Sequence, residues 1–139
     1  MQAEYKENLL FGGKLVVTAA HIEIVCYFRG PDLRYRGEWI HIPYSNFDEY
    51  ISAFRQNFKK YEELKTQMKD CEFSCVGVCG MKIRTGSRWG NGVTISQWRN
   101  HMRPMIFPID NEEKLEQVIF DFEYAKVRGV EIQQLLFAQ

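Results

Sequence analysis

A chain of 139 residues, 45% of them apolar, is long enough to bury the core of one globular domain and too short for two independent ones. Its 18 Lys and Arg balance its 18 Asp and Glu, so the whole chain attracts neither nucleic acid nor an anionic membrane, and a charged partner would have to meet a local patch. No apolar run approaches the length of a membrane span, and the first residues lack the basic start and apolar core of a secretory signal. The sequence therefore predicts an intracellular protein, in cytoplasm, nucleoid or nucleus, that does not cross a membrane.

The first half of the sequence predicts strands. A first strand is expected over residues 9–18, interrupted by Gly12 and Gly13, after a polar stretch at residues 1–8 that frays or leads into it. Residues 21–29 alternate in polarity, which predicts a strand with one face toward a core. After turn residues at 30–32, a further strand is expected to end near Pro43, with Trp39 and His41 facing outward, and an outward tryptophan needs an explanation. The residues expected to face inward are Ile22, Ile24, Cys26, Phe28, Ile40, Ile42 and Tyr44.

A long amphipathic helix is expected after Pro43. Ser45 or Asn46 would cap it, and apolar residues recur at helical spacing as far as about Met68. This stripe is expected to cover one face of the sheet as part of the core, through Phe47, Tyr50, Ile51, Phe54, Phe58, Tyr61 and Leu64.

The second half predicts a similar order of elements. Residues 71–84 are expected to form a strand with a bulge or bend at its glycines and with Met81 and Ile83 facing inward. Residues 85–92 predict a glycine-rich hairpin loop, and residues 93–102 the returning strand. A strand over residues 104–109, a cap at Asp110, a helix over residues 112–127 and a stop at Gly129 complete this half, and the apolar residues 130–139 form a final strand or a small docking helix. The buried stripe of the second helix is expected to be Leu115, Val118, Ile119 and Phe122.

The two strand–proline–helix segments align with each other. Pro43 falls on Pro108 and Asn46 on Asn111, an offset of 65 residues, so strand, proline, cap and helix recur in the same order. We therefore predict a single α+β domain over residues 1–139, built from two β-sheet-then-helix repeats, about ββββα twice, with antiparallel sheets and helices packed on one face. The first pseudo-repeat would span about residues 9–69, the second about 71–129, and the tail 130–139.

Basic residues are concentrated in one stretch of the second half. Between residues 76 and 104 the sequence holds five Lys and Arg and no acidic residue, whereas most acidic residues lie on the predicted helices and at the chain ends. Basic residues that track phosphates, together with aromatic rings that stack on bases, are typical of a sheet surface that binds single-stranded DNA or RNA. The candidate nucleic-acid-binding residues are Tyr27, Arg29, Arg34, Arg36, Trp39, Lys82, Arg84, Arg88, Trp89, Trp98, Arg99 and Arg103.

Other roles are compatible with the same residues. Charges on an edge strand discourage aggregation, and tryptophans pack in oligomer interfaces. A protein-binding inhibitor or adaptor, such as a small viral protein that occupies the nucleic-acid channel of its partner, fits the mixed charge equally well. A small α+β barrel or cone would instead bind an apolar or nucleotide ligand against the aromatic helix stripe.

Catalysis, cofactors and metal sites are not expected. No sequence context couples His21, His41 or His101 to a nucleophile or a carboxylate pair. Residues 86–92 lack the Lys-Ser/Thr ending of a phosphate-binding P-loop. The cysteines lack the C-x2-C pairs of common zinc sites, and without a secretory signal we expect reduced thiols at Cys26, Cys71, Cys75 and Cys79.

The order of about four strands and then one helix, twice over residues 14–129, resembles the Whirly family and its relatives, the transcriptional-coactivator single-strand binders and the PUR-domain proteins. The resemblance is architectural. It implies antiparallel sheets that carry single-stranded DNA or RNA, with the helices packed behind them. It also implies a homo-oligomer, often a tetramer of two-repeat chains, for which the apolar residues Leu135, Leu136 and Phe137 would fit a subunit contact.

Overall fold

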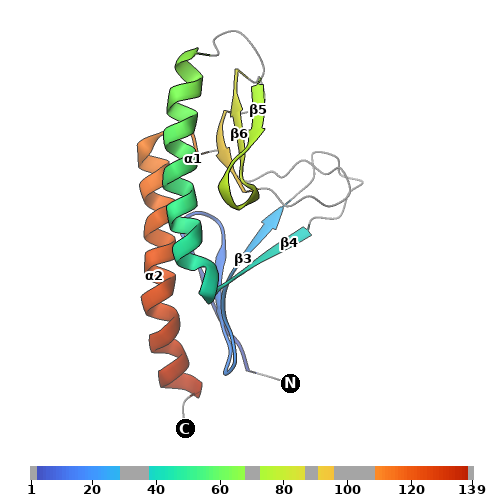
Figure 1. The fold of residues 1–139 in the computed structure, drawn as a ribbon. Coiled ribbons are helices and arrows are strands. Elements are labelled where there is room, and N and C mark those ends of the chain that lie inside the picture. Colours follow the sequence, from blue (N-terminus) through green and yellow to red (C-terminus); the bar gives the residue numbers. More distant parts are fainter. Residues whose placement is uncertain (1–2, 29–37, 68–72, 87–90, 96–108, 138–139) are drawn as a thin grey trace.

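A computed structural model of the chain describes residues 3–28, 38–67, 73–86, 91–95 and 109–137 (Figure 1). These residues form a four-stranded antiparallel sheet, a long helix, a three-stranded antiparallel sheet and a second long helix. The two helices lie side by side, and both sheets lie on the same side of the helix pair (Figure 1). The predicted α+β class, with antiparallel sheets and helices packed against them, is confirmed.

The first sheet contains β1 (Tyr5–Asn8), β2 (Lys14–Val17), β3 (Ile22–Phe28) and β4 (Glu38–Pro43), paired in chain order. The predicted strand over residues 9–18 is wrong in its extent, because residues 9–13 form the turn between β1 and β2. Ile24, Cys26, Ile40 and Ile42 are buried as predicted, and Ile22 is half-buried. Phe28 belongs to β3, but its side chain lies outside the described part of the structure.

The first helix, α1 (Phe47–Gln67), is preceded by a short 3-10 helix, η1 (Tyr44–Asn46). Tyr44 therefore leaves the strand and is 39% exposed, so the prediction that it faces inward is wrong. The aromatic stripe of α1 is core, as predicted. Its rings at Phe47 and Phe54 meet the Phe122 ring edge-on, with centroids 5.7 and 5.6 Å away. Such edge-to-face pairs are favourable aromatic geometry.

The second sheet contains β5 (Phe73–Val76), β6 (Lys82–Thr85) and β7 (Gly92–Thr94). The predicted single strand over residues 71–84 is wrong, because a 3-10 turn, η2 (Val78–Gly80), divides it into the antiparallel pair β5 and β6. Met81 and Ile83 are fully buried as predicted. Of the strand expected over residues 104–109, only Ile109 lies within the described residues, where it forms a single antiparallel bridge with Val93.

The second helix, α2 (Glu112–Phe137), is longer than predicted. The sequence suggested that Gly129 stops it, but Gly129 lies inside the helix, and residues 130–137 are its last turns. A Cβ at this position would lie 2.5 Å from Cγ2 of Ile22, so the glycine allows α2 to approach β3 closely. The predicted cap is also wrong by one residue, since the side chain of Asn111, not Asp110, accepts a hydrogen bond from the backbone N–H of Lys114, at 2.8 Å.

Each helix packs on the sheet that is formed by the other half of the chain. Ion pairs Arg55–Glu116 and Lys126–Asp48 show that α1 and α2 run antiparallel. The first helix packs mainly on β6 and β7, and the second on β2 and β3 (Figure 1). Each sheet is therefore covered by the helix that belongs to the other half of the sequence.

One buried polar side chain on each helix holds a hairpin turn of the sheet that this helix covers. Asp121 of α2 accepts hydrogen bonds from the backbone N–H groups of Leu10 and Phe11, at 3.1 and 2.6 Å. Asn57 of α1 accepts from the N–H of Val78 and donates to its carbonyl oxygen, both at 3.1 Å. A polar group in a helix core is stable when it is hydrogen-bonded in this way.

Candidate nucleic-acid interface

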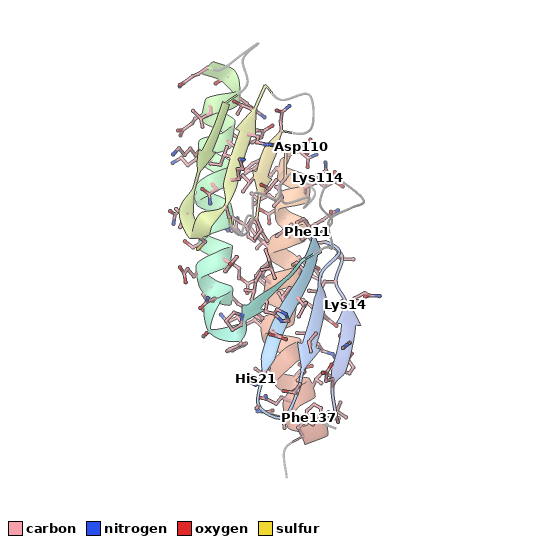
Figure 2. All side chains as sticks on the ribbon, turned by 90° about the vertical axis from the view of Figure 1, so that its right-hand side faces the viewer. Phe11, Lys14, His21, Asp110, Lys114 and Phe137 are labelled. Carbon is pink, nitrogen blue, oxygen red and sulfur yellow. The ribbon has the colours of Figure 1, made fainter. Side chains whose placement is uncertain are left out.

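The faces of the two sheets that point away from the helices are the candidate interface, and Figure 2 looks onto that side of the molecule. In the first sheet, the register aligns Lys14 with Val25 and His41 on one row across β2, β3 and β4. A parallel row aligns Lys6, Val16, Glu23 and Pro43. These residues alternate with the core-facing ones, so they form the open face. We call this surface the first open face, defined by Lys6, Lys14, Val16, Glu23, Val25 and His41.

The first open face has an apolar centre with charges around it. Val16 and Val25 are only 9% and 8% exposed, yet they are not part of the main core cluster. Lys14 is exposed, and Lys6 is paired with Glu4 at 3.4 Å. Because Val16 and Val25 are this far covered, the accessible charged groups of the face are the lysines at its margin, which are chemically suited to contact phosphates.

A contact between a histidine and a carboxylate also lies on this face. Nδ1 of His41 is 3.3 Å from Oε1 of Glu23, and the His41 side chain is 58% exposed. Pairs of this kind near the surface contribute little to the stability of the fold. Either side chain can therefore leave the pair and contact a ligand with little loss of folding free energy.

The second open face carries Lys82 and Arg84, two of the predicted site residues. Both are half-buried and alternate with fully buried neighbours, so they point away from α1 as the sequence predicted. Lys82 lies opposite Thr94, whose hydroxyl donates to the Lys82 carbonyl oxygen at 3.3 Å, and Arg84 lies opposite Gly92.

The structure brings two further predicted positions together. Tyr27 pairs with Trp39 in the register of β3 and β4, two positions along from the pair Val25 and His41, although both side chains lie outside the described part. Eight predicted site residues fall outside the described residues altogether: Arg29, Arg34, Arg36, Arg88, Trp89, Trp98, Arg99 and Arg103.

Lys6 and Lys14 were not predicted as site residues. The sequence carries little signal for them, because residues 5–8 (YKEN) are polar after Tyr5 and residues 14–17 (KLVV) are apolar after Lys14, so neither segment alternates in polarity.

The described cysteines are poor candidates for catalysis. Burial, together with the nearby charge of Asp121, raises the pKa of the Cys26 thiol to about 12. Burial and a hydrogen bond with Glu49, whose Oε1 is 3.4 Å from the sulfur, raise the pKa of Cys79 to about 11. Both therefore stay protonated at neutral pH, and the protonated thiol is a weak nucleophile and ligand.

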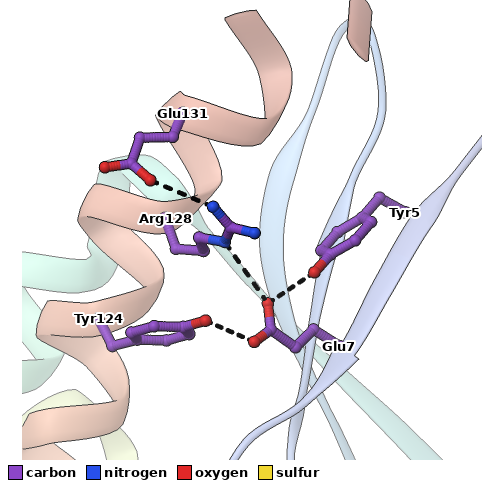
Figure 3. Close-up of polar contacts among 5 residues, drawn as sticks. All are labelled: Tyr5, Glu7, Tyr124, Arg128 and Glu131. Carbon is purple, nitrogen blue, oxygen red and sulfur yellow. Dashed lines mark hydrogen bonds and ion pairs between the residues drawn. The ribbon is translucent and has the colours of Figure 1, made fainter. Parts of the chain in front are cut away.

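A second polar cluster lies between β1 and α2, on the covered side of the first sheet (Figure 3). Glu7 accepts hydrogen bonds from the hydroxyls of Tyr5, at 2.9 Å, and of Tyr124. The bond to Glu7 raises the pKa of the Tyr124 hydroxyl. Arg128 lies 4.0 Å from the same carboxylate and pairs with Glu131 at 3.3 Å. These contacts fasten the edge strand β1 to α2, which is a structural role.

The described residues show neither a metal-binding cluster nor a membrane-spanning helix. Within the ranges that the structure describes, no group of three or more His, Cys, Asp or Glu side chains is arranged to hold a metal ion. In the same ranges, neither helix has an apolar stretch long enough to pass through a bilayer.

Comparisons of the chain with protein-family models, with curated proteins and with solved structures found no match.

Proposed function

We propose that this protein binds single-stranded nucleic acid along the open faces of its two sheets. The observation that carries the proposal is the placement of both described helices on one side, which leaves Lys6, Lys14, Lys82 and Arg84 on sheet faces that neither α1 nor α2 covers. Phosphates would contact these cations, and bases would lie on the sheet. The aromatic positions Tyr27, Trp39, Trp89 and Trp98 would add stacking of about 1–3 kcal/mol per base.

We also propose that the two halves are copies of one sheet-then-helix unit, each of which contributes one binding face. The two hairpin turns support this. In each, the first residue donates its N–H to the carbonyl oxygen four residues on, from Leu9 to Gly13 at 2.8 Å and from Gly77 to Met81 at 2.6 Å. The next residue of each turn is then held by a polar side chain of the helix that covers it. Two equivalent faces would let one strand of nucleic acid contact the protein twice.

In this proposal the protein is a binding protein and not an enzyme, and it needs no cofactor. The resemblance to oligomeric single-strand binders extends the proposal to a homo-oligomer, in which several open faces would hold one polymer. Multiple linked contacts of this kind raise the overall affinity without any new type of contact.

The test is fluorescence-anisotropy binding of labelled single-stranded DNA and RNA, each about 20 nucleotides long, at several salt concentrations. We assume that Lys6, Lys14, Lys82 and Arg84 each neutralise one phosphate. Each phosphate contributes about −0.7 to the slope for single strands, so a plot of the logarithm of the association constant against the logarithm of the salt concentration should have a slope of about −3.

Two double variants make the test specific. Lys82→Glu/Arg84→Glu reverses two charges on the second open face, and we expect it to weaken binding about tenfold or more. Lys59→Glu/Lys60→Glu makes the same charge change on the exposed side of α1 and should leave most of the affinity intact. Equal losses in both variants would show that only net charge matters, and no binding at low salt would refute the proposal and favour the protein-docking alternative.

A further inference from the structure

The side of α2 that faces away from the sheets carries a row of exposed apolar residues. The buried side of the helix holds Phe122 and Gly129. On the opposite side, Phe120, Val127 and Leu135 are 57%, 62% and 77% exposed. Spacings of seven and eight residues place them on one line along a helix. They alternate with glutamates, and we call the whole row the α2 stripe: Glu116, Phe120, Glu123, Val127, Glu131 and Leu135.

The α2 stripe contains several exposed apolar residues on one line and is not a single exposed side chain. A single exposed apolar residue needs no explanation, whereas apolar residues that share one line over several turns are typical of a helix-docking surface. From Phe120 to Leu135 the line covers about 22 Å, at 1.5 Å per residue. The Phe120 ring is also held in place, since it stacks on the Tyr124 ring with centroids 6.1 Å apart and planes at 15°.

The charges of the stripe decide what kind of partner fits. A second copy of α2 would bring glutamates against glutamates: Glu123 meets Glu131 in an antiparallel pair centred on Val127, and each glutamate meets itself in a parallel pair. Like charges opposed in this way disfavour the contact, and Arg55 and Arg128, which pair with Glu116 and Glu131 within the chain, offset part of this repulsion. Nucleic acid and anionic membranes carry the same sign as the stripe and are disfavoured for the same reason.

We propose that the α2 stripe docks a basic amphipathic helix of another protein. The apolar side of that helix would pack on Phe120, Val127 and Leu135, and its Lys or Arg side chains would reach the intervening glutamates. Two of these glutamates already have basic neighbours, since Glu116 pairs with Arg55 and Glu131 with Arg128, each at 3.3 Å. All four side chains are more than a third exposed, so these ion pairs are weak and can exchange partners.

The inference is independent of the proposed function. The α2 stripe lies on the side of the helix opposite Gly129, which packs against Ile22 of the first sheet. A partner on this stripe therefore leaves the open faces of the sheets free, and the two sites can be occupied together.

The probe for the test is a labelled synthetic helix of about 20 residues, with leucine every third or fourth position and lysine or arginine elsewhere. A second peptide replaces each basic residue with glutamate. Binding to the full chain is followed by fluorescence anisotropy, and we expect the basic peptide to bind and the acidic one not to bind.

Four variants locate the contact. Phe120→Ala/Val127→Ala and Glu123→Lys should each weaken binding of the basic peptide by about tenfold. Leu136→Ala and Glu63→Lys are matched controls, because they make similar changes at exposed positions outside the stripe and should bind as the wild type does. Circular dichroism of the four variants serves as the control for folding.

Three results would overturn the inference. One is absence of binding by the basic peptide, and another is an equal loss in the control variants. The third is a dimer, seen by sedimentation velocity, that Phe120→Ala/Val127→Ala dissociates, because the stripe would then be a contact between two copies of this chain.

Discussion

Asn57 and Gly77 form a contact whose energetics can be predicted from the structure. Gly77 has extended backbone angles, φ −94° and ψ −164°, which alanine also adopts without strain. A Cβ at this position would nevertheless lie 1.7 Å from Oδ1 of Asn57 and 2.5 Å from its Cγ. Glycine is therefore required here by the neighbouring carboxamide and not by the local backbone.

The magnitudes follow from the hydrogen bonds that each substitution removes. Asn57→Ala deletes the two bonds to the backbone of Val78, which at about 1 kcal/mol each predicts a loss of about 2 kcal/mol in the free energy of unfolding. Gly77→Ala displaces the carboxamide, so it breaks the same two bonds and is expected to cost about 2–3 kcal/mol. In the double variant the methyl group occupies space that the carboxamide has left. We expect it to be about as stable as Asn57→Ala alone, so the sum of the single effects is too large by about 2 kcal/mol.

The assay is urea unfolding followed by far-UV circular dichroism of the wild type, both single variants and the double variant. Gln56→Ala is the control, since Gln56 is the exposed neighbour of Asn57 and its substitution should change stability by less than about 0.5 kcal/mol. Additive effects in the double variant, or a Gly77→Ala protein as stable as the wild type, would show that this contact does not hold the turn.

Three further predictions concern single side chains. Burial raises the pKa of Asp121 above its ordinary 3.8. The contribution of Asp121 to the free energy of unfolding is therefore greatest below that value and is lost as pH rises through the folded-state pKa. In urea unfolding at about pH 4 to 7, the stability of the wild type relative to Asp121→Asn should fall as pH rises, and a flat or rising difference contradicts this. Gly129→Ala places a methyl group 2.5 Å from Cγ2 of Ile22 and should lower the melting temperature despite the better helix propensity of alanine, with partial rescue by Ile22→Ala; a higher melting temperature would contradict the close approach. Alkylation of Cys79 by iodoacetamide, read by mass spectrometry, should be slow near neutral pH and faster in Glu49→Ala, which removes both the hydrogen bond and the charge that help to raise the thiol pKa; equal rates would count against it.

The helices were the most predictable part of the fold. The apolar stripes of α1 and α2 recur at helical spacing, and this signal depends only on which side chains are buried. Local signals for where helices end were less reliable. Gly129 was expected to stop α2, but the close contact with Ile22 explains this glycine, and a contact more than 100 residues away in sequence leaves no local pattern.

The turns were harder to place than the strands. Residues 71–84 contain two strands because Gly77 to Met81 closes a tight hairpin, and the side chain that secures it, Asn57, lies on a helix in the other half of the chain. An asparagine inside an amphipathic helix is a detectable irregularity in sequence, but its partner is not. Residues 9–13 escaped prediction for the same reason, since Asp121 holds that turn.

The candidate site was predictable only in part. The alternation of polar and apolar residues in β6 correctly predicted that Lys82 and Arg84 point away from the core, because inward and outward residues alternate along a strand regardless of the rest of the fold. Lys6 and Lys14 became visible only when β1 and β2 were separated. That two sheets expose their basic faces on one side depends on the crossover of the helices, which no short sequence pattern encodes.

The crossover has a consequence for the order in which the chain can fold during synthesis. The strands of the first sheet are complete by Pro43, but the helix that covers them, α2, follows some 70 residues later. While the ribosome is still making the second half, the apolar side of the first sheet lacks α2, the helix that packs on β2 and β3. We therefore expect the nascent first half to depend on transient shielding, by α1 or by a chaperone, until α2 has emerged and both sheets close together in one cooperative step.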